Sequence, residues 1–206
     1  MPQELSLEFV YDVSGTPYEN TYFGLFTLNQ ATKVRLVREF TTTFPTLTKV
    51  KGRQLRKKEF IDIIRFLDER KVRMRVCSFT RHDWRYYLNI NSYRKDNNFK
   101  IKIASMIFYE LAKNIIWSDC CYSLTSCVES QLGNVDDLFK FLNKLASSRD
   151  VQFECTHGRG AYNRVVQIAD YIAYSGRMIK ESDLAQFEHY EFVTARFNEH
   201  ELKFLF

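Results

Sequence analysis

Segments with a strand-like pattern of apolar residues alternate along this chain with segments in which apolar residues recur at helical spacing. Strand-like runs rich in β-branched and aromatic residues occupy positions 5–13, 22–28, 72–79, 120–128 and 151–155. Apolar residues at helical spacing occupy positions 30–40, 57–70, 101–117, 135–145 and 164–177. The sequence SGTP at 14–17 consists of residues that are typical of turns, which predicts a hairpin between the first two strands.

This order of elements predicts an α/β fold. Strands that alternate with helices form a largely parallel sheet covered by helices, and the N-terminal hairpin makes that sheet mixed. In the strand at 72–79, Val72, Met74 and Val76 alternate with arginines and a cysteine, which predicts a half-buried strand. With only 3 Pro and 7 Gly in 206 residues, little of the chain is left for linkers, so we expect one domain over residues 1–206.

The last residues of the chain are unusually apolar. Residues 178–206 form a C-terminal extension that ends in LKFLF at 202–206. Such a segment is too apolar to be left in water, so it either packs back on the domain or forms a subunit contact. A homodimer through this segment is therefore one expectation.

Composition excludes several classes of protein. Hydrophobic residues make up 45% and charged residues 27%, as in folded globular chains. Residues 1–8 carry two acids and no basic stretch, so they do not resemble a secretory signal, and no run reaches the roughly 20 apolar residues of a membrane span. We therefore expect a cytoplasmic protein without a membrane partner. The five cysteines show no zinc-type spacing and are expected to be free thiols.

Positive charge is concentrated in one part of the sequence. Between positions 49 and 102 there are 17 Lys and Arg against 6 Asp and Glu, whereas the rest of the chain is net acidic. This asymmetry favours a polyanionic partner such as nucleic acid, although solvated helix faces can also be rich in basic residues. The candidate nucleic-acid contacts are Lys49, Lys51, Arg53, Arg56, Lys57, Arg81, Arg85 and, in a loop near glycines, Arg159.

Three carboxylates occupy positions that chemistry tends to use. Asp12 ends the first strand, Glu129 follows the strand at 120–128, and Asp170 interrupts the apolar helix at 165–173. A buried acid needs a partner, and ligands bind at the carboxyl ends of strands in α/β sheets. If these acids converge, they would hold Mg²⁺ or Mn²⁺, which prefer oxygen ligands. In the alternative, Asp170 points to solvent or pairs locally with Arg164 or Arg177.

Three short motifs resemble a known family. YDVSG at 11–15 is similar to the opening Asp-Glu-Ser-Gly signature of the family called "domain of unknown function 3800". VKGRQL at 50–55 resembles its Lys-Gly element, and QIADYIA at 167–173 its closing helix, so the resemblance spans about residues 5–177. It implies a ribonuclease H-like fold and a metal-dependent nuclease. Asp12 would then be the central ligand, Asp170 the helix-borne ligand and Glu129 the third, while Lys51 would contact a phosphate or orient a carboxylate.

The chain also departs from that family's pattern. Val13 stands where the family usually has Glu. Lys49 stands where the family usually has an acid, two positions before the lysine that corresponds to Lys51. Glu129 stands where Asp is more common. A site with fewer carboxylates binds two hard cations more weakly than one with the full set. The second expectation is therefore a catalytically depleted ribonuclease H-like protein that binds nucleic acid or another protein.

Overall fold

The fold is built on one mixed sheet. The computed structural model of the chain describes residues 3–47, 50–90, 96–118, 120–127, 132–147, 150–158, 163–197 and 202–203. Within these ranges six strands form a sheet of order β5-β4-β1-β2-β3-β6. The strands are β1 (Gln3–Gly15), β2 (Thr21–Asn29), β3 (Met74–Phe79), β4 (Cys120–Cys127), β5 (Gln152–His157) and β6 (Tyr190–Val193).

The strand pairings confirm the predicted hairpin and the mixed, mostly parallel sheet. β1 pairs antiparallel with β2, and β2 antiparallel with β3. The pairs β1–β4, β4–β5 and β3–β6 are parallel. In this register Asp12 of β1 faces Gly24 on β2 and Cys127 on β4.

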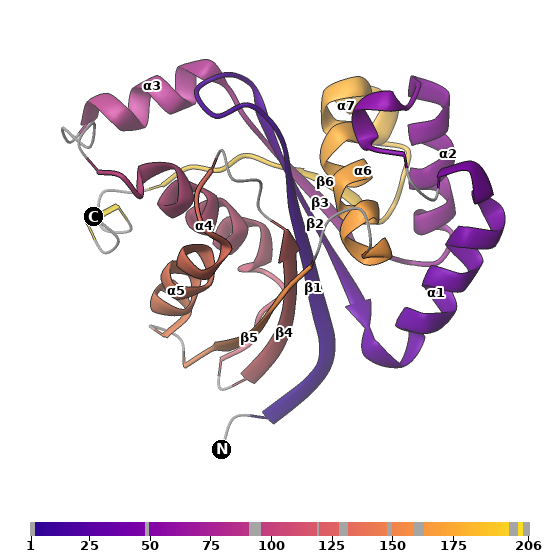
Figure 1. Ribbon diagram of the computed structural model, residues 1–206, viewed down its shortest axis with the longest axis horizontal. Helices are drawn as coiled ribbons and strands as arrows, with labels where there is room; N and C mark the ends of the chain where they lie inside the picture. The colour runs from indigo at the N-terminus through magenta and orange to yellow at the C-terminus, as the bar shows by residue number, and fades with distance from the viewer. Residues whose placement is uncertain are drawn as a thin grey trace.

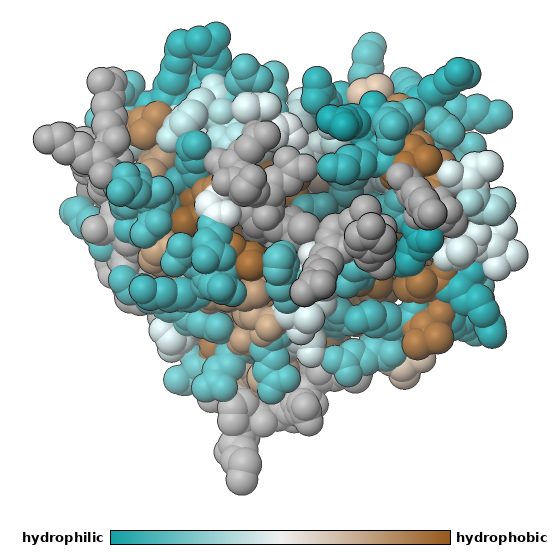
Figure 2. All heavy atoms as spheres, viewed as in Figure 1, coloured by the Kyte–Doolittle hydropathy of each residue, from teal (hydrophilic) through white to brown (hydrophobic). Residues whose placement is uncertain are grey.

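Helices cover both faces of the sheet (Figure 1). One side holds α3 (Arg81–Ile90), α4 (Phe99–Ala112) and α5 (Val135–Ala146). The other side holds α1 (Gln30–Thr43), α2 (Lys57–Asp68), α6 (Arg164–Met178) and α7 (Glu181–Leu184), with the short turns η1 (Pro45–Leu47) and η2 (Gly52–Gln54). On the surface in the same view, hydrophilic residues line the upper rim over both helical layers, and hydrophobic residues form smaller areas between them (Figure 2).

Successive residues of β1 point into two separate hydrophobic clusters. Phe9 and Tyr11 belong to the cluster under α4 and α5, whereas Val10 belongs to the cluster under α2 and α6. Because side chains alternate along a strand, Asp12 shares the face of Val10 and therefore lies on the α6 side of the sheet. Tyr11, on the opposite face, donates a hydrogen bond from its hydroxyl to the Ala104 carbonyl oxygen, 2.9 Å away.

The strand β3 is buried on both faces, which corrects the expectation of a half-buried strand. Arg75 is only 3% exposed and Cys77 is fully buried. The guanidinium of Arg75 makes two hydrogen bonds to the carboxylate of Glu191 and one to the Leu111 carbonyl oxygen. The side chains of β3 do alternate between the two faces of the sheet. However, the segment after α7 forms β6 beside β3, and α4 covers the face on which Arg75 and Cys77 lie. The arginine is therefore buried with partners instead of facing water.

Asparagine side chains begin three of the helices. Asn29, Asn134 and Asn163 each accept a hydrogen bond from the backbone N–H two residues later, at the starts of α1, α5 and α6. An amide oxygen at this position satisfies one of the unpaired N–H groups of the first helical turn. The start of α6, which positions the candidate site, is thus fixed by its own sequence.

The described part of the C-terminal segment packs back on the domain. Leu202 is buried in the cluster under α4 and α5, and Phe197 packs against that cluster. The ring of Phe197 lies 5.0 Å from that of Tyr87, whose hydroxyl accepts its backbone N–H. This arrangement agrees with the first of the two alternatives for the tail and gives no support to a homodimer. Residues 198–201 and 204–206 lie outside the described ranges.

Two further expectations concern cysteines and membranes. Cys77, Cys120, Cys121 and Cys155 are free thiols, as predicted, and the side chain of the fifth cysteine, Cys127, lies outside the described part of the structure. In the described part of the chain, every helix is too short or too polar to cross a bilayer.

Candidate functional site

Asp12 lies near the carboxyl ends of the two central parallel strands. Its side chain is 8% exposed, and its Oδ1 accepts a hydrogen bond from the Val13 N–H at 2.8 Å. Its parallel partner, Cys127, is the last residue of β4. β1 itself continues to Gly15, so Asp12 does not end its own strand but lies level with the end of β4, the edge at which α/β sheets bind ligands.

A close helix–strand approach brings α6 over Asp12. A Cβ atom on Gly24, the register partner of Asp12, would lie 2.6 Å from the backbone nitrogen of Ala173 and 3.0 Å from the carbonyl oxygen of Ala169. Only glycine allows the helix backbone to come this near to the sheet. Asp170 belongs to the same turn of α6. The fold thus brings the segments of Asp12 and Asp170 together on one face of the sheet.

Asp170 contacts the basic segment that precedes α2. Its Oδ2 accepts a hydrogen bond from the backbone N–H of Gly52 at 2.8 Å. Gly52 is buried, and a Cβ there would lie 2.6 Å from Cδ2 of Tyr174. The sequence predicted either that Asp170 converges with Asp12 and Glu129 or that it points to solvent or pairs with Arg164 or Arg177. The contact with a residue 118 positions away was not foreseen.

Two further polar residues of α6 hold the same segment. The amide Nε2 of Gln167 donates to the carbonyl oxygens of Leu47 and Val50, at 2.8 and 3.0 Å. The hydroxyl of Tyr171 lies 3.0 and 2.6 Å from the same two oxygens. Burial, with the charge of Asp170 adding to it, raises the pKa of Tyr171 above its usual range, so the hydroxyl remains a donor. We did not predict these anchors, although a Gln and a Tyr four residues apart in an apolar helix need partners.

The basic segment next to Asp170 is exposed. Lys51, Arg53, Arg56 and Lys57 all face solvent around η2 and the first turn of α2. The ammonium of Lys57 pairs with Asp183 at 2.7 Å, so part of its charge is compensated. Because Gly52 is fixed to Asp170, the neighbouring cations of this segment are held beside the candidate site.

The predicted contacts on α3 lie elsewhere. Arg81 and Arg85 are exposed, but α3 packs on the other face of the sheet from α6 (Figure 1). Within its mixed basic and aromatic sequence, Trp84 and Tyr87 are buried in the core. The Trp84 Nε1 donates to the Thr21 hydroxyl at 3.1 Å. The fold therefore does not join these arginines to the basic segment at residues 51–57.

Three of the predicted site residues, Lys49, Glu129 and Arg159, lie outside the described residues. Among the residues that are described, no three His, Cys, Asp or Glu side chains gather closely enough to hold a metal ion. The described part of the site therefore offers Asp12 and Asp170 as its carboxylates.

Ser14 adds a polar group near Asp12. It lies two residues further along β1, which places it on the same α6 side of the sheet. It is 3% exposed, and its Oγ has no hydrogen-bond partner within the described ranges. A buried hydroxyl without a partner is costly, so it is an observation that fits a ligand at this position.

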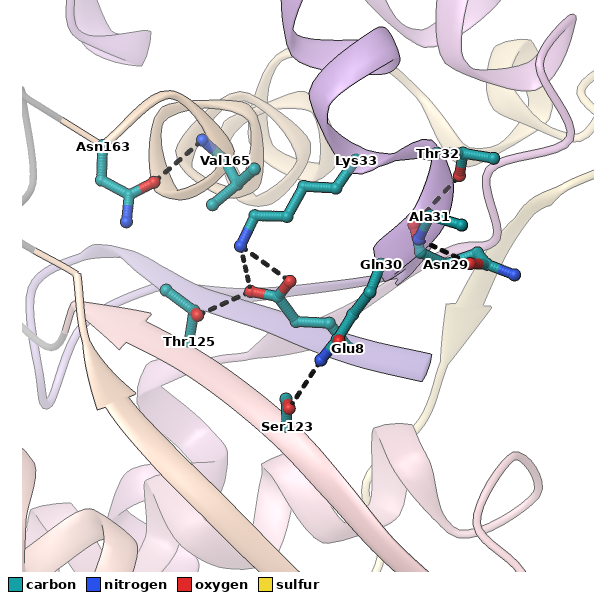
Figure 3. A network of polar contacts seen from close by, with 10 residues as sticks. All are labelled: Glu8, Asn29, Gln30, Ala31, Thr32, Lys33, Ser123, Thr125, Asn163 and Val165. Carbon is teal, nitrogen blue, oxygen red and sulfur yellow. Dashed lines mark hydrogen bonds and ion pairs between the residues drawn. The ribbon is translucent and has the colours of Figure 1, made fainter. Parts of the chain in front are cut away.

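A second buried acid lies on the same face of β1. Glu8 is 3% exposed and its two carboxylate oxygens lie 2.8 and 2.9 Å from the Nζ of Lys33 (Figure 3). The Thr125 hydroxyl of β4 donates to it at 2.7 Å. We did not predict this pair, although an acid at an inward position of a buried strand indicates a charged partner. With its charge matched by Lys33, Glu8 ties α1 to the sheet.

Comparisons with known proteins bear on the fold. No family model matches the chain, and no curated protein sequence matches it. Among solved structures, it resembles RNase HII in the PCNA:RNase HII complex from Archaeoglobus fulgidus, with a TM-score of 0.51 and 12% identity over 87% of this chain and 74% of the other. It also resembles a mutant of Bst-RNase HIII, with a TM-score of 0.53 and 13% identity over 88% of this chain and 55% of the other. The fold is ribonuclease H-like.

Proposed function

We propose that this protein is a metal-dependent nuclease that hydrolyses phosphodiester bonds of nucleic acid. One observation carries the proposal: α6 crosses β2 at Gly24, the register partner of Asp12 on β1, so that the segments bearing Asp12 and Asp170 share one face beside the exposed cations at residues 51–57. An acidic pair for a cation next to a basic surface for phosphates is the arrangement that metal-assisted phosphodiester cleavage needs.

The donor set is suited to a hard divalent cation. Asp12 and Asp170 would hold Mg²⁺ or Mn²⁺, and Glu129 would complete the carboxylates, since it follows Cys127, the β4 partner of Asp12, by two positions. The unpartnered Ser14 hydroxyl adds a further oxygen on this side of β1. When bound, such a cation activates a water molecule and stabilises the leaving oxygen.

The basic segment would orient the nucleic acid. Lys51 and Arg53 flank Gly52, whose backbone is fixed to Asp170, so their charges are held near the reacting phosphate. Arg56 extends the same exposed surface toward α2. The resemblance to RNase HII and RNase HIII supports nucleic acid as the substrate class.

The test is cleavage of labelled single-stranded DNA, single-stranded RNA, duplex DNA and an RNA–DNA hybrid with Mg²⁺ or Mn²⁺. Asp12→Asn is expected to lower the cleavage rate at least about 100-fold, because a ligand of the cation loses its charge. Asp62→Asn, which changes a partly exposed carboxylate of α2, is the matched control and should cleave like the wild type. Mn²⁺ should also raise the melting temperature of the wild type and not of Asp12→Asn.

A second candidate function is a binding module without catalysis. It is favoured by Val13, which replaces an acid of the resembled family, and by the use of Asp170 as an acceptor for Gly52. In this case the protein binds nucleic acid in a salt-dependent way, cleaves none of the four substrates with either ion, and gains no thermal stability from Mn²⁺. That set of results would replace the nuclease proposal.

A further inference from the structure

A cleft of about 640 Å³ opens between α1 and the start of α6. It is lined by Lys33, Val34, Val37, Arg38, Asn163, Arg164 and Val165. Figure 3 shows the side chain of Lys33 leaving α1 and passing the first turn of α6 toward Glu8 on β1. The buried Glu8–Lys33 pair, joined by Thr125, thus ties the α1 wall of the cleft to the sheet.

The lining combines an apolar part with cations. Val34, Val37 and Arg38 lie on one side of α1, at positions three and four residues apart. Val34 is 78% exposed, although it is a large aliphatic residue. Arg38 is exposed and Arg164 is half-buried on the facing helix. Of the three cationic side chains that line the described part of the cleft, Lys33 is paired with Glu8, which leaves Arg38 and Arg164. No acidic residue is part of this lining, so the cleft is complementary to an anion with an apolar part.

The position of the cleft connects it to the candidate site. Arg164 and Asp170 lie on the same helix, six residues and therefore about 9 Å apart along its axis. Gln167 lies between them, accepts a hydrogen bond from Arg164 at 2.8 Å and anchors the basic segment through Val50. Polar groups thus continue along α6 from the cleft to Asp170.

From these observations we infer that the α1–α6 cleft binds an unpaired stretch of nucleic acid, with a base against the valines and the backbone phosphates against Arg38 and Arg164. An unpaired base exposes apolar faces that a base inside a duplex does not, and phosphates pair with guanidinium groups. The inference deepens the proposed function, since it rests on nucleic acid being the substrate and selects single strands as the form held at this site.

The test is fluorescence anisotropy with fluorescein-labelled dT12, rU12 and a 12-base-pair duplex, at low salt and in EDTA so that no cleavage occurs. Arg38→Ala and Val34→Asp should each weaken binding of the single strands about 10-fold or more. Arg38→Ala should also reduce the slope of log Kd against log salt by about 0.7, the loss expected for one phosphate contact on a single strand. Comparison of dT12 with rU12 tells whether DNA or RNA is preferred.

Arg35→Ala is the matched control because Arg35 lies on the same helix, is exposed and pairs with Glu39 away from the cleft. It should bind within about twofold of the wild type. The inference is overturned if the wild type does not bind single strands, or if Arg38→Ala and Val34→Asp bind them like the wild type. It is also overturned if Arg35→Ala lowers the affinity for single strands as much as Arg38→Ala does, or if binding of the duplex depends on Arg38 to the same extent.

The two proposals fail separately. Binding that depends on Arg38 without any cleavage rejects the nuclease and keeps the cleft. Cleavage that depends on Asp12, with no effect of Arg38→Ala or Val34→Asp on binding, keeps the nuclease and rejects the cleft.

Discussion

The carboxylate of Asp170 lies 2.8 Å from the backbone nitrogen of Gly52, although 118 residues separate the two in sequence. This hydrogen bond joins the VKGRQL segment at 50–55 to the QIADYIA segment at 167–173 of α6. It gives Asp170 a structural role that is present without any metal ion. Experiments on this residue must therefore separate folding from chemistry.

A comparison of Asp170→Ala with Asp170→Asn separates the role of Asp170 in folding from its role in catalysis. Asp170→Ala leaves the buried N–H of Gly52 without its acceptor and should lower the free energy of unfolding by about 1–3 kcal/mol. Asp170→Asn keeps an oxygen that can accept the bond and should cost less than about 1 kcal/mol. Urea unfolding measures both, and hydrogen exchange at Gly52 should accelerate in the alanine variant alone. If the asparagine variant is stable and still cleaves normally, Asp170 serves the fold and not the cation.

The close approach of α6 to Gly24 of β2 predicts that a larger residue at position 24 destabilises the protein. Gly24→Ala places a methyl group 2.6 Å from the backbone of Ala173, so α6 must move and stability should fall by about 1–3 kcal/mol. For a chain of this length that corresponds to a decrease of roughly 2–12 °C in melting temperature. The matched variant is Gly176→Ala, further along the same helix.

At Gly176 a Cβ atom would meet the Val76 side chain at 2.6 Å and not backbone. Alanine also gains about 1 kcal/mol of helix propensity over glycine, which offsets part of the clash. Gly176→Ala should therefore be closer to the wild type than Gly24→Ala. The reverse order in thermal melts would mean that α6 does not rest on β2 as described.

The buried pair of Glu8 and Lys33 predicts strong coupling. Lys33→Met leaves the carboxylate of Glu8 in the core with only Thr125 as partner, and should cost about 1–3 kcal/mol, since the lysine side chain is 35% exposed and water can partly replace it. The double variant Glu8→Gln, Lys33→Met should recover part of this loss. A double-mutant cycle from urea unfolding measures the coupling, and additive effects would contradict it.

The buried thiol of Cys77 predicts how stability depends on pH. Burial raises the pKa of Cys77 to about 12, with the charges of Asp83 and Glu110 adding to the effect, whereas an unfolded cysteine titrates near about 8.5. Between these values the folded protein binds more protons than the unfolded one, so the free energy of unfolding falls as pH rises, by about 1.4 kcal/mol per pH unit for this thiol. Below about pH 8 its contribution is fully present.

Urea unfolding between pH 8 and pH 10 checks this slope. Cys77→Ala should be less stable at pH 7.5, because it leaves a cavity, yet its stability should decline less steeply above pH 8.5. A slope equal to that of the wild type would mean that Cys77 ionises freely in the folded state. Cys155, whose pKa burial also raises to about 12, contributes in the same direction and remains in both proteins.

Much of the fold was predictable because local patterns and tertiary structure agree. The hairpin followed from the SGTP turn between two β-rich segments, and the parallel pairing of β1, β4 and β5 followed from the alternation of strands with helices. The placement of Asp170 next to Gly52 was not predictable, because α6 reads locally as an apolar helix with one acid. A contact over 118 residues leaves no periodic signal in the sequence.

Buried polar residues make further contacts that local sequence patterns do not predict. The alternation along residues 72–79 predicted a solvent-facing position for Arg75, yet its side chain is buried and its guanidinium donates to the Leu111 carbonyl oxygen and to the partly exposed carboxylate of Glu191. The ion pair of Glu8 with Lys33 was not predicted either. In both cases the partner comes from an element distant in sequence, so the periodicity of one segment cannot reveal it.

The last strand of the sheet has a consequence for how the protein is made. β6 pairs with β3 through residues 190–193, and Glu191 supplies two acceptors for Arg75. Until residues 190–193 have left the ribosome, β3 is an unpaired edge strand and Arg75 lacks the carboxylate of Glu191. The β3 edge of the sheet is therefore completed late in biosynthesis. We expect chaperones to bind the nascent chain at this edge until β6 has paired with β3.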